Sequence, residues 1–451
     1  MMPGKYDLIV IGAGPGGHAA AEHAAGWGAR VAIIEKNQWG GTCTHKGCIP
    51  TKALLACSKQ YANLKKLKRL GVSPGGVSVD FAAMKRHQRQ MVSVSSLGVQ
   101  KSLKDSGVEL KTGEGRIVAR GEVEWVTSKG DAQRLTSDSI IIAWGSEPQL
   151  PSGIKPSGRI VTSDGFLALE VLPESVIIIG GSVIGVEFAT LLAELGVKVT
   201  LVELLDRIIP HEDEEAAVFL RQELMRLGIT IHTSANIETV RETSHGVTMQ
   251  GAHHAGPLSV TADYALICTG RKPLLHTGEL NQCGIEYDQR GIIVNDNQKT
   301  TREGIYAIGD VTGGVMLAHR AMQQGRAVAS YLYGDHSITY REDAVPSIVY
   351  SHPAVARVGL TEAQAAERGL EIKITRAEYA SNIIARTELK GNGFVKAIFY
   401  KERLIGVTIA GDDAGELIAS MALAVTNEME RKELKKWIIP HPTLSEILHI
   451  L

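Results

Sequence analysis

The sequence predicts an α/β fold, in which two copies of one strand–turn–helix–strand unit precede a C-terminal α+β region. A glycine-rich turn follows a short apolar run at Gly12 and again at Gly180, 168 residues later. The same offset separates Glu35 from Glu203. From about Asp335 the pattern changes to strands and amphipathic helices. With 451 residues, the chain is also too long for one compact core, so several domains are expected.

The first unit begins with an apolar run of strand length, Tyr6 to Ile11. Gly12-Ala-Gly14-Pro-Gly-Gly17 follows, then an alanine-rich helical stretch and a second strand that ends at Glu35. The first glycine permits a tight turn, the second lets the backbone approach a pyrophosphate, and the third lets helix and strand pack closely. The helix N-terminus attracts phosphate, and Glu35 is placed to accept hydrogen bonds from an adenosine ribose. The unit therefore predicts a Rossmann-like dinucleotide-binding domain.

The second unit carries Gly180-Gly-Ser182-Val-Ile-Gly185 at the corresponding place and ends at Glu203. Ser182 takes the position of the middle glycine, where its side chain is expected to crowd a pyrophosphate. An acid at Glu203, in place of a cluster of arginines, favours NAD over NADP, and Arg207 weakens that preference only slightly. Two units predict two bound nucleotides, or one nucleotide beside a relic of a second site.

Composition narrows the classes of partner. Lys plus Arg number 48 and Asp plus Glu 49, so the net charge of −1 offers no reason to expect nucleic acid or an anionic membrane as partner. The most apolar stretch, Val176 to Val186, is too short for a membrane span, and Asp7 interrupts any signal peptide. Five cysteines do not form a secreted disulfide framework, so we expect a cytoplasmic location.

A cysteine pair follows the first unit, in the stretch Trp39-Gly-Gly-Thr-Cys43-Thr-His-Lys-Gly-Cys48-Ile-Pro-Thr-Lys52. Three interpretations are open. A metal site formed by Cys43, His45 and Cys48 needs a fourth ligand that the sequence does not offer at a suitable spacing, so we expect no metal. Two inert thiols are the second, although the glycines suggest the close approach of a flat group. The sequence favours the third, a redox disulfide near a helix N-terminus, where the helix dipole and Lys52 stabilise a thiolate.

The chain resembles the class I pyridine nucleotide-disulfide oxidoreductases, and within that family it is most similar to the dihydrolipoamide dehydrogenases. The resemblance runs nearly end to end. It rests on the double nucleotide unit and on motifs that are specific in combination: Gly-Gly-Thr-Cys43-x4-Cys48-Ile-Pro-x-Lys52, Ile-Tyr-Ala-Ile-Gly309-Asp310, Leu-Ala318-His319-Arg-Ala, Pro353 to Glu362, and His441-Pro-Thr-Leu-Ser-Glu446.

The resemblance implies a redox role for four residues. Cys43 is the thiol that exchanges with substrate, and Cys48 is the thiolate that stacks on the flavin. Lys52 lies near the reactive flavin nitrogen. Glu187 lies where the nicotinamide approaches the flavin. The implied site is therefore a flavin between a disulfide and a nicotinamide.

The resemblance also makes His441 the general base, oriented by Glu446. A thiol with a pKa near ~8.5 is mostly protonated at neutral pH, so a dithiol substrate needs such a base. The residues alone leave another interpretation open, because Thr443 and Glu446 fit the capping box of a short helix, which needs no catalysis.

Two cofactors, FAD and NAD, are implied. Asp310 is implied to bind the ribityl hydroxyls of FAD. The residues implied to contact FAD are Gly12, Gly14, Gly17, Glu35, Lys36, Gly41, Thr42, Lys52, Gly115, Ala143, Gly145, Asp310 and Ala318. Those implied to contact NAD are Gly180, Gly185, Glu187, Glu203 and Gly270.

Four segments are expected along the chain: the first part of an FAD-binding domain at 1–150, an NAD-binding domain at 151–270, a central segment at 271–335 that completes the FAD site, and a C-terminal dimerisation domain at 336–451. In the family the base acts on the partner subunit's disulfide, so the resemblance implies a homodimer. It also implies a lipoyl-carrying partner from a 2-oxo acid dehydrogenase or glycine-cleavage system.

The implied activity is the flavin-dependent oxidation of protein-bound dihydrolipoamide to lipoamide, with reduction of NAD+ to NADH, through a Cys43–Cys48 redox disulfide. Three alternatives stay open. They are an NAD(P)H-dependent reductase of another small disulfide, an NAD(P) transhydrogenase, and a structural subunit of a multienzyme complex.

The sequence departs from the family at several positions. Thr44-His45 replaces the usual Leu-Asn, and this pair is also seen in soluble transhydrogenases, which usually lack one of the two cysteines. Trp144 stands in the usual Ala-Thr-Gly stretch, which places a bulky ring near FAD. Ala354 and Ile439 replace a common Glu and a common His. The last two bear on substrate fit and dimer contacts more than on redox competence.

Overall fold

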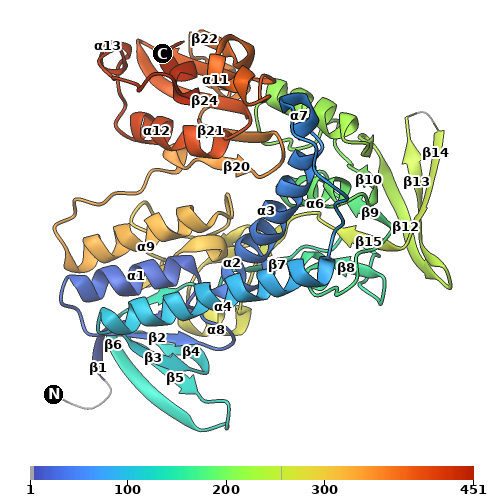
Figure 1. Ribbon diagram of the computed structural model, residues 1–451. Helices are drawn as coiled ribbons and strands as arrows, with labels where there is room; N and C mark the ends of the chain where they lie inside the picture. The colour runs from blue at the N-terminus through green and yellow to red at the C-terminus, as the bar shows by residue number, and fades with distance from the viewer. Residues whose placement is uncertain (1–4, 255, 451) are drawn as a thin grey trace. The chain divides into compact units, whose positions relative to one another are not determined.

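The computed structural model describes residues 5–254 and 256–450. These residues form two compact units, whose elements are labelled in Figure 1. Unit 1 contains 5–53, Arg86–Gln149 and Arg271–Tyr340. Unit 2 contains Leu54–Lys85, Leu150–Gly270 and the described residues from Arg341 onward.

A seven-stranded sheet forms the centre of unit 1. Its strands are β1 (Lys5–Ile11), β2 (Val31–Glu35), β3 (Glu109–Thr112), β4 (Glu114–Ala119), β5 (Glu122–Val126), β6 (Ala132–Ile142) and β19 (Ile305–Ala307). The order is β3-β2-β1-β6-β5-β4, with β19 also paired to β6. All pairs are parallel except β4–β5 and β5–β6. A parallel sheet with β1 at its centre is the arrangement of a dinucleotide-binding domain.

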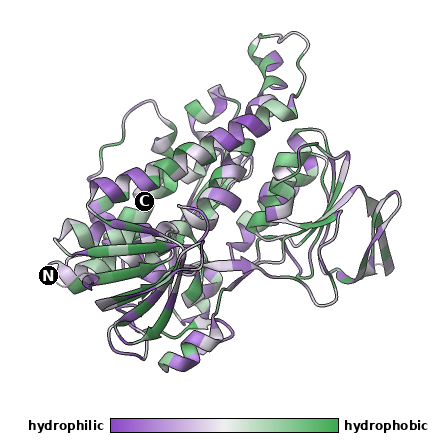
Figure 2. Cartoon of the chain, turned by 90° about the horizontal axis from the view of Figure 1, so that it is seen from below, coloured by the Kyte–Doolittle hydropathy of each residue, from purple (hydrophilic) through white to green (hydrophobic). Residues whose placement is uncertain are grey.

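The strand β1 separates two hydrophobic cores. Leu8 and Val10 are buried in one core, and Ile9 and Ile11 are buried in the other. Successive side chains of a strand point to opposite faces, so a run of apolar residues fits a sheet that is covered on both sides. Figure 2 shows hydrophobic colour on the strands that lie near the N-terminal end of the chain.

Two helices pack closely on this sheet, α1 (Pro15–Gly26) and α9 (Ala318–Tyr333). Their contact depends on small residues. A Cβ atom at Gly16 would lie 3.1 Å from the Cβ of Ala321, and one at Gly325 would lie 2.5 Å from the carbonyl oxygen of Gly16. The close approach fixes where the N-terminus of α1 lies.

Unit 2 contains a second parallel sheet, of five strands in the order β11-β10-β9-β15-β8. The strands are β8 (Ile160–Thr162), β9 (Ser175–Ile179), β10 (Lys198–Val202), β11 (Thr230–His232) and β15 (Tyr264–Ile267). The helices α6 (Val183–Glu194) and α7 (Glu214–Arg226) follow β9 and β10 in the chain, and β12 (Asn236–Thr243), β13 (Gly246–His253) and β14 (Gly256–Ala262) form an antiparallel sheet. This part repeats the architecture of unit 1 around β1.

The C-terminal part of unit 2 is an antiparallel sheet in the order β20-β21-β24-β23-β22. Its strands are β20 (Ser347–Val349), β21 (Ala354–Gly359), β22 (Lys373–Glu378), β23 (Gly393–Tyr400) and β24 (Arg403–Gly411). The helices here are α10 (Glu362–Glu367), α11 (Ile383–Thr387), α12 (Ala414–Thr426), α13 (Arg431–Leu434) and the 3-10 helix η5 (Leu444–Ile450). The predicted α/β fold with a C-terminal α+β region is confirmed.

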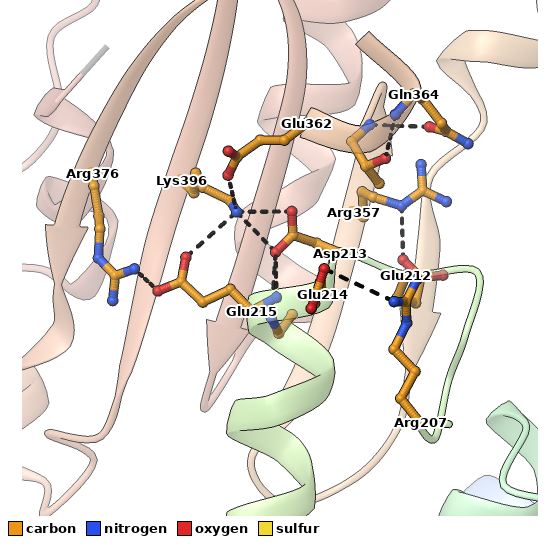
Figure 3. A network of polar contacts seen from close by, with 12 residues as sticks. Arg207, Glu212, Asp213, Glu214, Glu215, Arg357, Glu362, Gln364, Arg376 and Lys396 are labelled. Atoms are coloured by element: carbon orange, nitrogen blue, oxygen red, sulfur yellow. Dashed lines mark hydrogen bonds and ion pairs between the residues drawn. The ribbon is translucent and has the colours of Figure 1, made fainter. Parts of the chain in front are cut away.

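A network of charges joins α7 to this C-terminal sheet within unit 2 (Figure 3). Asp213 caps α7 by accepting hydrogen bonds from two of its backbone N–H groups. The Nζ atom of Lys396, on β23, lies 2.8 Å from Asp213 and also contacts Glu362. Both side chains of the Lys396–Asp213 pair are nearly inaccessible, at 5% and 3% exposed. A buried charge without a partner is costly, so Lys396 and Asp213 favour one specific packing of α7 on the C-terminal sheet.

Within residues 5–254 and 256–450, none of the helices combines the length and apolar character that a membrane span requires.

Candidate active site

The glycine turn of unit 1 leaves the N-terminus of α1 open. Gly12 has a φ of 106°, and a Cβ atom there would lie 2.3 Å from the carbonyl oxygen of Ala143. A Cβ atom at Gly17 would lie 1.9 Å from the carbonyl oxygen of Gly12. A Cβ atom at Gly14, in contrast, would have no heavy atom of the described residues within 4 Å apart from its immediate chain neighbours. The turn thus leaves open space beside Gly14 at the N-terminus of α1, which fits a pyrophosphate.

Glu35 ends β2 beside this turn and is buried. Its Oε2 accepts a hydrogen bond from the N–H of Ala13 at 2.8 Å, and its Oε1 accepts hydrogen bonds from the N–H groups of Asn37 at 2.9 Å and Gln38 at 3.3 Å. A carboxylate has about four acceptor positions, so capacity for ribose hydroxyls remains. Lys36 follows as an exposed residue. Gly115 lies on β4, where a Cβ atom would be 3.0 Å from the side chain of Ile34.

Asp310 lies in unit 1 on the 3-10 helix η2 (Gly309–Thr312), before Ala318 begins α9. Its Oδ2 accepts a hydrogen bond from the hydroxyl of Ser146 at 2.5 Å. Arg271 donates to both the hydroxyl and the carbonyl oxygen of Ser146, each at 2.8 Å. Gly145, with a φ of 79°, precedes this serine. Arg271 and Ser146 therefore orient Asp310, a support that no motif indicated.

The ring of Trp144 does not stand free. It packs edge-on against the ring of His276, with centroids 4.6 Å apart, and against a core of unit 1. Burial lowers the pKa of His276, and the positive charge of Lys36 lowers it further. The neutral imidazole is the form that suits contact with an indole ring in a half-buried place.

The cysteine stretch forms two helices that meet at Gly47. Cys43 lies in α2 (Gly41–Lys46), and Cys48 is the first residue of α3 (Cys48–Leu64). The N–H of Gly40 donates to the carbonyl oxygen of Ala13 at 3.0 Å. A Cβ atom at Gly41 would lie 2.8 Å from the Cα of Gly14, so the glycine next to Thr42 abuts the pyrophosphate turn. The sequence thereby holds the cysteine pair close to the turn.

The two sulfurs differ electrostatically. A hydrogen bond with Cys48 raises the pKa of the Cys43 thiol, and burial and the charge of Cys48 raise it further, whereas Lys52 opposes these effects. Cys48 lies at the N-terminus of α3, and Lys52 follows one turn later, so the helix dipole and the ammonium group both favour a thiolate at this position.

Thr44 and His45 are occupied in local packing. The Nε2 of His45 donates to the carbonyl oxygen of Trp39 at 3.0 Å, and the hydroxyl of buried Thr44 lies 3.4 Å from that of Ser95. Across the described ranges, no group of three or more His, Cys, Asp or Glu side chains is arranged to hold a metal ion. The departure from the usual Leu-Asn thus supports the packing of α2.

The second glycine turn, in unit 2, matches the first closely. Gly180 has a φ of 108°, and a Cβ atom there would lie 2.5 Å from the carbonyl oxygen of Cys268. A Cβ atom at Gly185 would lie 2.0 Å from the carbonyl oxygen of Gly180. The hydroxyl of Ser182 donates to the carbonyl oxygen of Cys268 at 2.9 Å. Gly270, with a φ of 108°, closes the unit. The hydroxyl of Ser182 is therefore bonded to the residue that follows β15, next to Gly180.

Glu203 occupies the place that Glu35 has in the first unit. It is buried and accepts hydrogen bonds from the N–H groups of Gly181 at 2.5 Å and Leu205 at 2.8 Å. Arg207 donates to the carbonyl oxygen of Pro210 at 3.2 Å, so the guanidinium is engaged within its own loop.

Glu187 is buried on α6 and accepts a hydrogen bond from the N–H of Tyr350 at 3.2 Å. Burial raises the pKa of Cys268, and the charge of Glu187 raises it further. Two turns later, buried Glu194 accepts from the hydroxyl of Ser58 at 2.5 Å and bonds the Nδ1 of His352 at 2.7 Å. No motif indicated this cluster, because the only signal in the sequence is the second acid, Glu194, in a largely apolar helix.

His441 and Glu446 are joined in unit 2. The Nδ1 of His441 lies 2.8 Å from Oε1 of Glu446, and the N–H of Thr443 donates to Oε2 at 2.9 Å. A hydrogen bond from Thr443 lowers the pKa of Glu446, and His441 lowers it further. Only one half of the predicted capping box is formed, because the Thr443 hydroxyl donates to Pro440. The carboxylate thus serves both the turn and the ring, and the ring is 76% exposed.

Comparison with known proteins matches residues 6–325 to the pyridine nucleotide-disulphide oxidoreductase family and residues 345–450 to the dimerisation domain of the same family. A dihydrolipoyl dehydrogenase of Bacillus subtilis is 38% identical over 99% of this chain and 95% of its own length. One of Chlorobaculum tepidum is 36% identical over 98% of this chain and 95% of its own length.

Among solved structures, LpdA of Mycobacterium tuberculosis has a TM-score of 0.91, with 26% identity and 98% of each chain covered. The HOCl-induced flavoprotein disulfide reductase RclA of Escherichia coli has a TM-score of 0.86, with 28% identity over 99% of this chain and 98% of that one. The chain therefore belongs to the pyridine nucleotide-disulphide oxidoreductase family, as its motifs predicted.

Proposed function

We propose that the protein oxidises dihydrolipoamide to lipoamide and reduces NAD+ to NADH, with FAD as resident cofactor. The observation that carries the proposal is the cysteine pair held against an open pyrophosphate turn, with Cys48 at a helix N-terminus. The relatives named dihydrolipoyl dehydrogenase support the choice of substrate. When bound, FAD supplies the means to carry two electrons from a thiolate to a nicotinamide as hydride.

FAD is held by residues of unit 1. The pyrophosphate fits the open turn at Gly14, where the N-terminus of α1 offers its N–H groups. Glu35 has acceptor capacity for the ribose hydroxyls, and Asp310 has it for the ribityl chain. Lys52 follows Cys48 by one helical turn, and its positive charge opposes the rise in the pKa of the Cys43 thiol. NAD+ would be held at the matching turn of unit 2, next to Glu203.

His441 removes a proton from the substrate. The carboxylate of Glu446 only accepts, so Nδ1 of His441 carries the proton of their hydrogen bond and Nε2 is the basic atom. The exposed ring takes a proton from one substrate thiol onto Nε2, and the imidazolium is stabilised by Glu446.

The cysteines then exchange electrons with the dithiol. The substrate thiolate attacks the sulfur of Cys43 in the Cys43–Cys48 disulfide, and the S–S bond breaks to leave a thiolate on Cys48. The second substrate thiol displaces Cys43 from the mixed disulfide. This releases lipoamide and leaves Cys43 as a thiol, in agreement with its raised pKa.

A homodimer follows from the family's dimerisation domain at residues 345–450. We assign His441 and Glu446 of each protomer to the disulfide of the other. The natural substrate is a lipoyl group on a carrier protein of a 2-oxo acid dehydrogenase or glycine-cleavage system. A reducing compartment such as the cytoplasm suits five cysteines that form no structural disulfide.

A second candidate is the NADH- or NADPH-dependent reduction of another small disulfide. It is favoured by the likeness to RclA, a flavoprotein disulfide reductase, along nearly the whole chain. The same cysteines serve both activities, but electrons flow in opposite directions. The preferred electron donor separates the two.

Cysteine replacements test the proposal. We expect Cys43→Ser and Cys48→Ser each to abolish NADH formation from dihydrolipoamide and NAD+, because neither variant forms the disulfide. Cys57→Ser is the matched control, since Cys57 lies further along the same helix and is expected to keep full activity. Retention of dithiol oxidation in Cys48→Ser would refute the mechanism.

A further inference from the structure

One buried amide, Asn382, holds the loop that carries His441 and Glu446. Its Nδ2 donates to the carbonyl oxygen of Thr443 at 3.0 Å and reaches that of Leu444 at 3.4 Å. Its Oδ1 accepts from the N–H of Ala385 at 3.0 Å, which caps α11. The side chain is 7% exposed, and both ends of its amide are in use. It therefore ties the loop to a helix about 60 residues earlier in the chain.

The segment that carries Asn382 packs tightly on the C-terminal sheet. Tyr379, in the turn before Asn382, is fully buried, and its hydroxyl donates to the carbonyl oxygen of Asp412 at 2.9 Å. A Cβ atom at Gly411 would lie 2.4 Å from the Tyr379 ring, so the ring packs directly on β24. Ala385 is fully buried as well. The position of Asn382 is therefore set by the C-terminal sheet.

Both backbone polar groups of Thr443 form hydrogen bonds. Its N–H donates to Oε2 of Glu446 at 2.9 Å, and its carbonyl oxygen accepts from Asn382. The other oxygen of Glu446 holds Nδ1 of His441 at 2.8 Å. A path of hydrogen bonds and covalent backbone thus leads from the C-terminal sheet through Asn382, Thr443 and Glu446 to the imidazole ring, which is exposed within its own chain.

We infer that Asn382 is a positioning residue for the proton transfer, which fixes the His441–Glu446 pair through the backbone of Thr443 and Leu444. The inference rests on the proposed role of His441 as base for the dithiol. It assigns Asn382 to the dithiol half of the reaction alone, because the hydrogen bonds of its side chain go to Thr443, Leu444 and Ala385, outside the residues that we assign to FAD or NAD.

The chemistry of the amide suggests a selective variant. Asn382→Asp keeps the oxygen that caps α11 but replaces the donor by a second oxygen, which then faces two carbonyl oxygens. Asn382→Ala removes both bonds. Asn392→Asp is the control, because Asn392 is exposed in the same unit and makes one long contact of 3.4 Å to Glu223.

The experiment uses the FAD-loaded enzyme in anaerobic stopped flow, with the flavin absorbance as signal. One series mixes the oxidised enzyme with dihydrolipoamide, and the other mixes it with NADH. We expect Asn382→Asp and Asn382→Ala to slow reduction by dihydrolipoamide by about tenfold to a hundredfold, the scale of a small misplacement of a catalytic group. Reduction by NADH should stay within about twofold, and Asn392→Asp should change neither rate.

Other outcomes are equally informative. His441→Ala slowing the dithiol reaction while both Asn382 variants match the parent would overturn this inference and leave the proposed function intact. Slowing of both series together with a lower melting temperature would make Asn382 a structural residue only and also overturn it. An undiminished dithiol reaction in His441→Ala would refute the proposed base itself.

Discussion

The two nucleotide units use one backbone but differ at the middle position of the turn. Gly14 has φ −65° and ψ 179°, and Ser182 has φ −68° and ψ 178°. Any residue adopts this extended conformation, so the chain itself does not require glycine there. The outer glycines are required in both units, because a Cβ atom at Gly17 or Gly185 would meet a carbonyl oxygen. The difference separates the outer glycines, which the backbone requires, from Gly14, whose role we assign to the ligand.

The outer glycines should give the largest effect. A Cβ atom would lie 1.9 Å from a carbonyl oxygen in Gly17→Ala and 2.0 Å in Gly185→Ala. We expect each variant to lose roughly 3 kcal/mol of unfolding free energy, measured by urea denaturation. Gly26→Ala is the control, because a Cβ atom there meets nothing within 4 Å among the described residues. An unchanged unfolding free energy in either variant would contradict the equivalence of the two turns.

The middle position should affect ligands without affecting the fold. In Gly14→Ser, a side chain enters the open space of the turn, and we expect FAD affinity to fall by roughly a hundredfold, measured by fluorescence on reconstitution of the apoprotein. The melting temperature of that apoprotein should not change.

Ser182→Gly should leave the KM for NAD+ within about threefold, because the serine hydroxyl is already bonded to the carbonyl oxygen of Cys268. A large gain in NAD+ affinity would show that Ser182 does crowd the pyrophosphate.

The paired acids should behave alike. Each carboxylate accepts a hydrogen bond from a backbone N–H group of its own turn. Glu35→Gln and Glu203→Gln therefore leave the buried amide side chain with poorly satisfied hydrogen bonds. We expect Glu203→Gln to raise the KM for NAD+ roughly tenfold with little change in kcat, and Glu35→Gln to weaken FAD retention on dialysis by a similar factor. A loss of kcat alone would contradict a role in binding.

The smallest effect is expected at Cys268, which lies against Gly180 as Ala143 lies against Gly12. Burial and the charge of Glu187 raise the pKa of this thiol, so it stays protonated and inert. Cys268→Ala, which copies the first unit, should cost about 1 kcal/mol of stability and leave activity unchanged. Alkylation of the native reduced enzyme should spare Cys268, and modification as fast as that of the active-site pair would contradict its assignment.

The sequence predicted the parts of this molecule that depend on short stretches of chain. The glycine turns, the acids that end β2 and follow β10, and the cysteine pair were recognised from spacing alone. Contacts between remote segments were not, because no local pattern encodes them. Three sets of hydrogen bonds form only after the sheets have assembled. Ser146 and Arg271 orient Asp310. Ser58 and His352 bind Glu194, and Asn382 donates to Thr443.

The direction of the Ser182 side chain could not be predicted from the sequence either. Spacing showed that a side chain occupies the middle position, but the direction of the hydroxyl depends on the carbonyl group of Cys268, 86 residues away. Trp144 is a similar case, since its ring packs on His276 from a separate segment.

The most direct test of the account is an anaerobic spectral titration of the purified yellow enzyme with dihydrolipoamide, followed by NAD+. We predict a long-wavelength band from the Cys48 thiolate against the flavin, and then the appearance of NADH with return of the oxidised flavin spectrum. A flavin that dihydrolipoamide does not reduce, but that NADH or NADPH does, would contradict the account and establish a reductase of another disulfide or a transhydrogenase in its place.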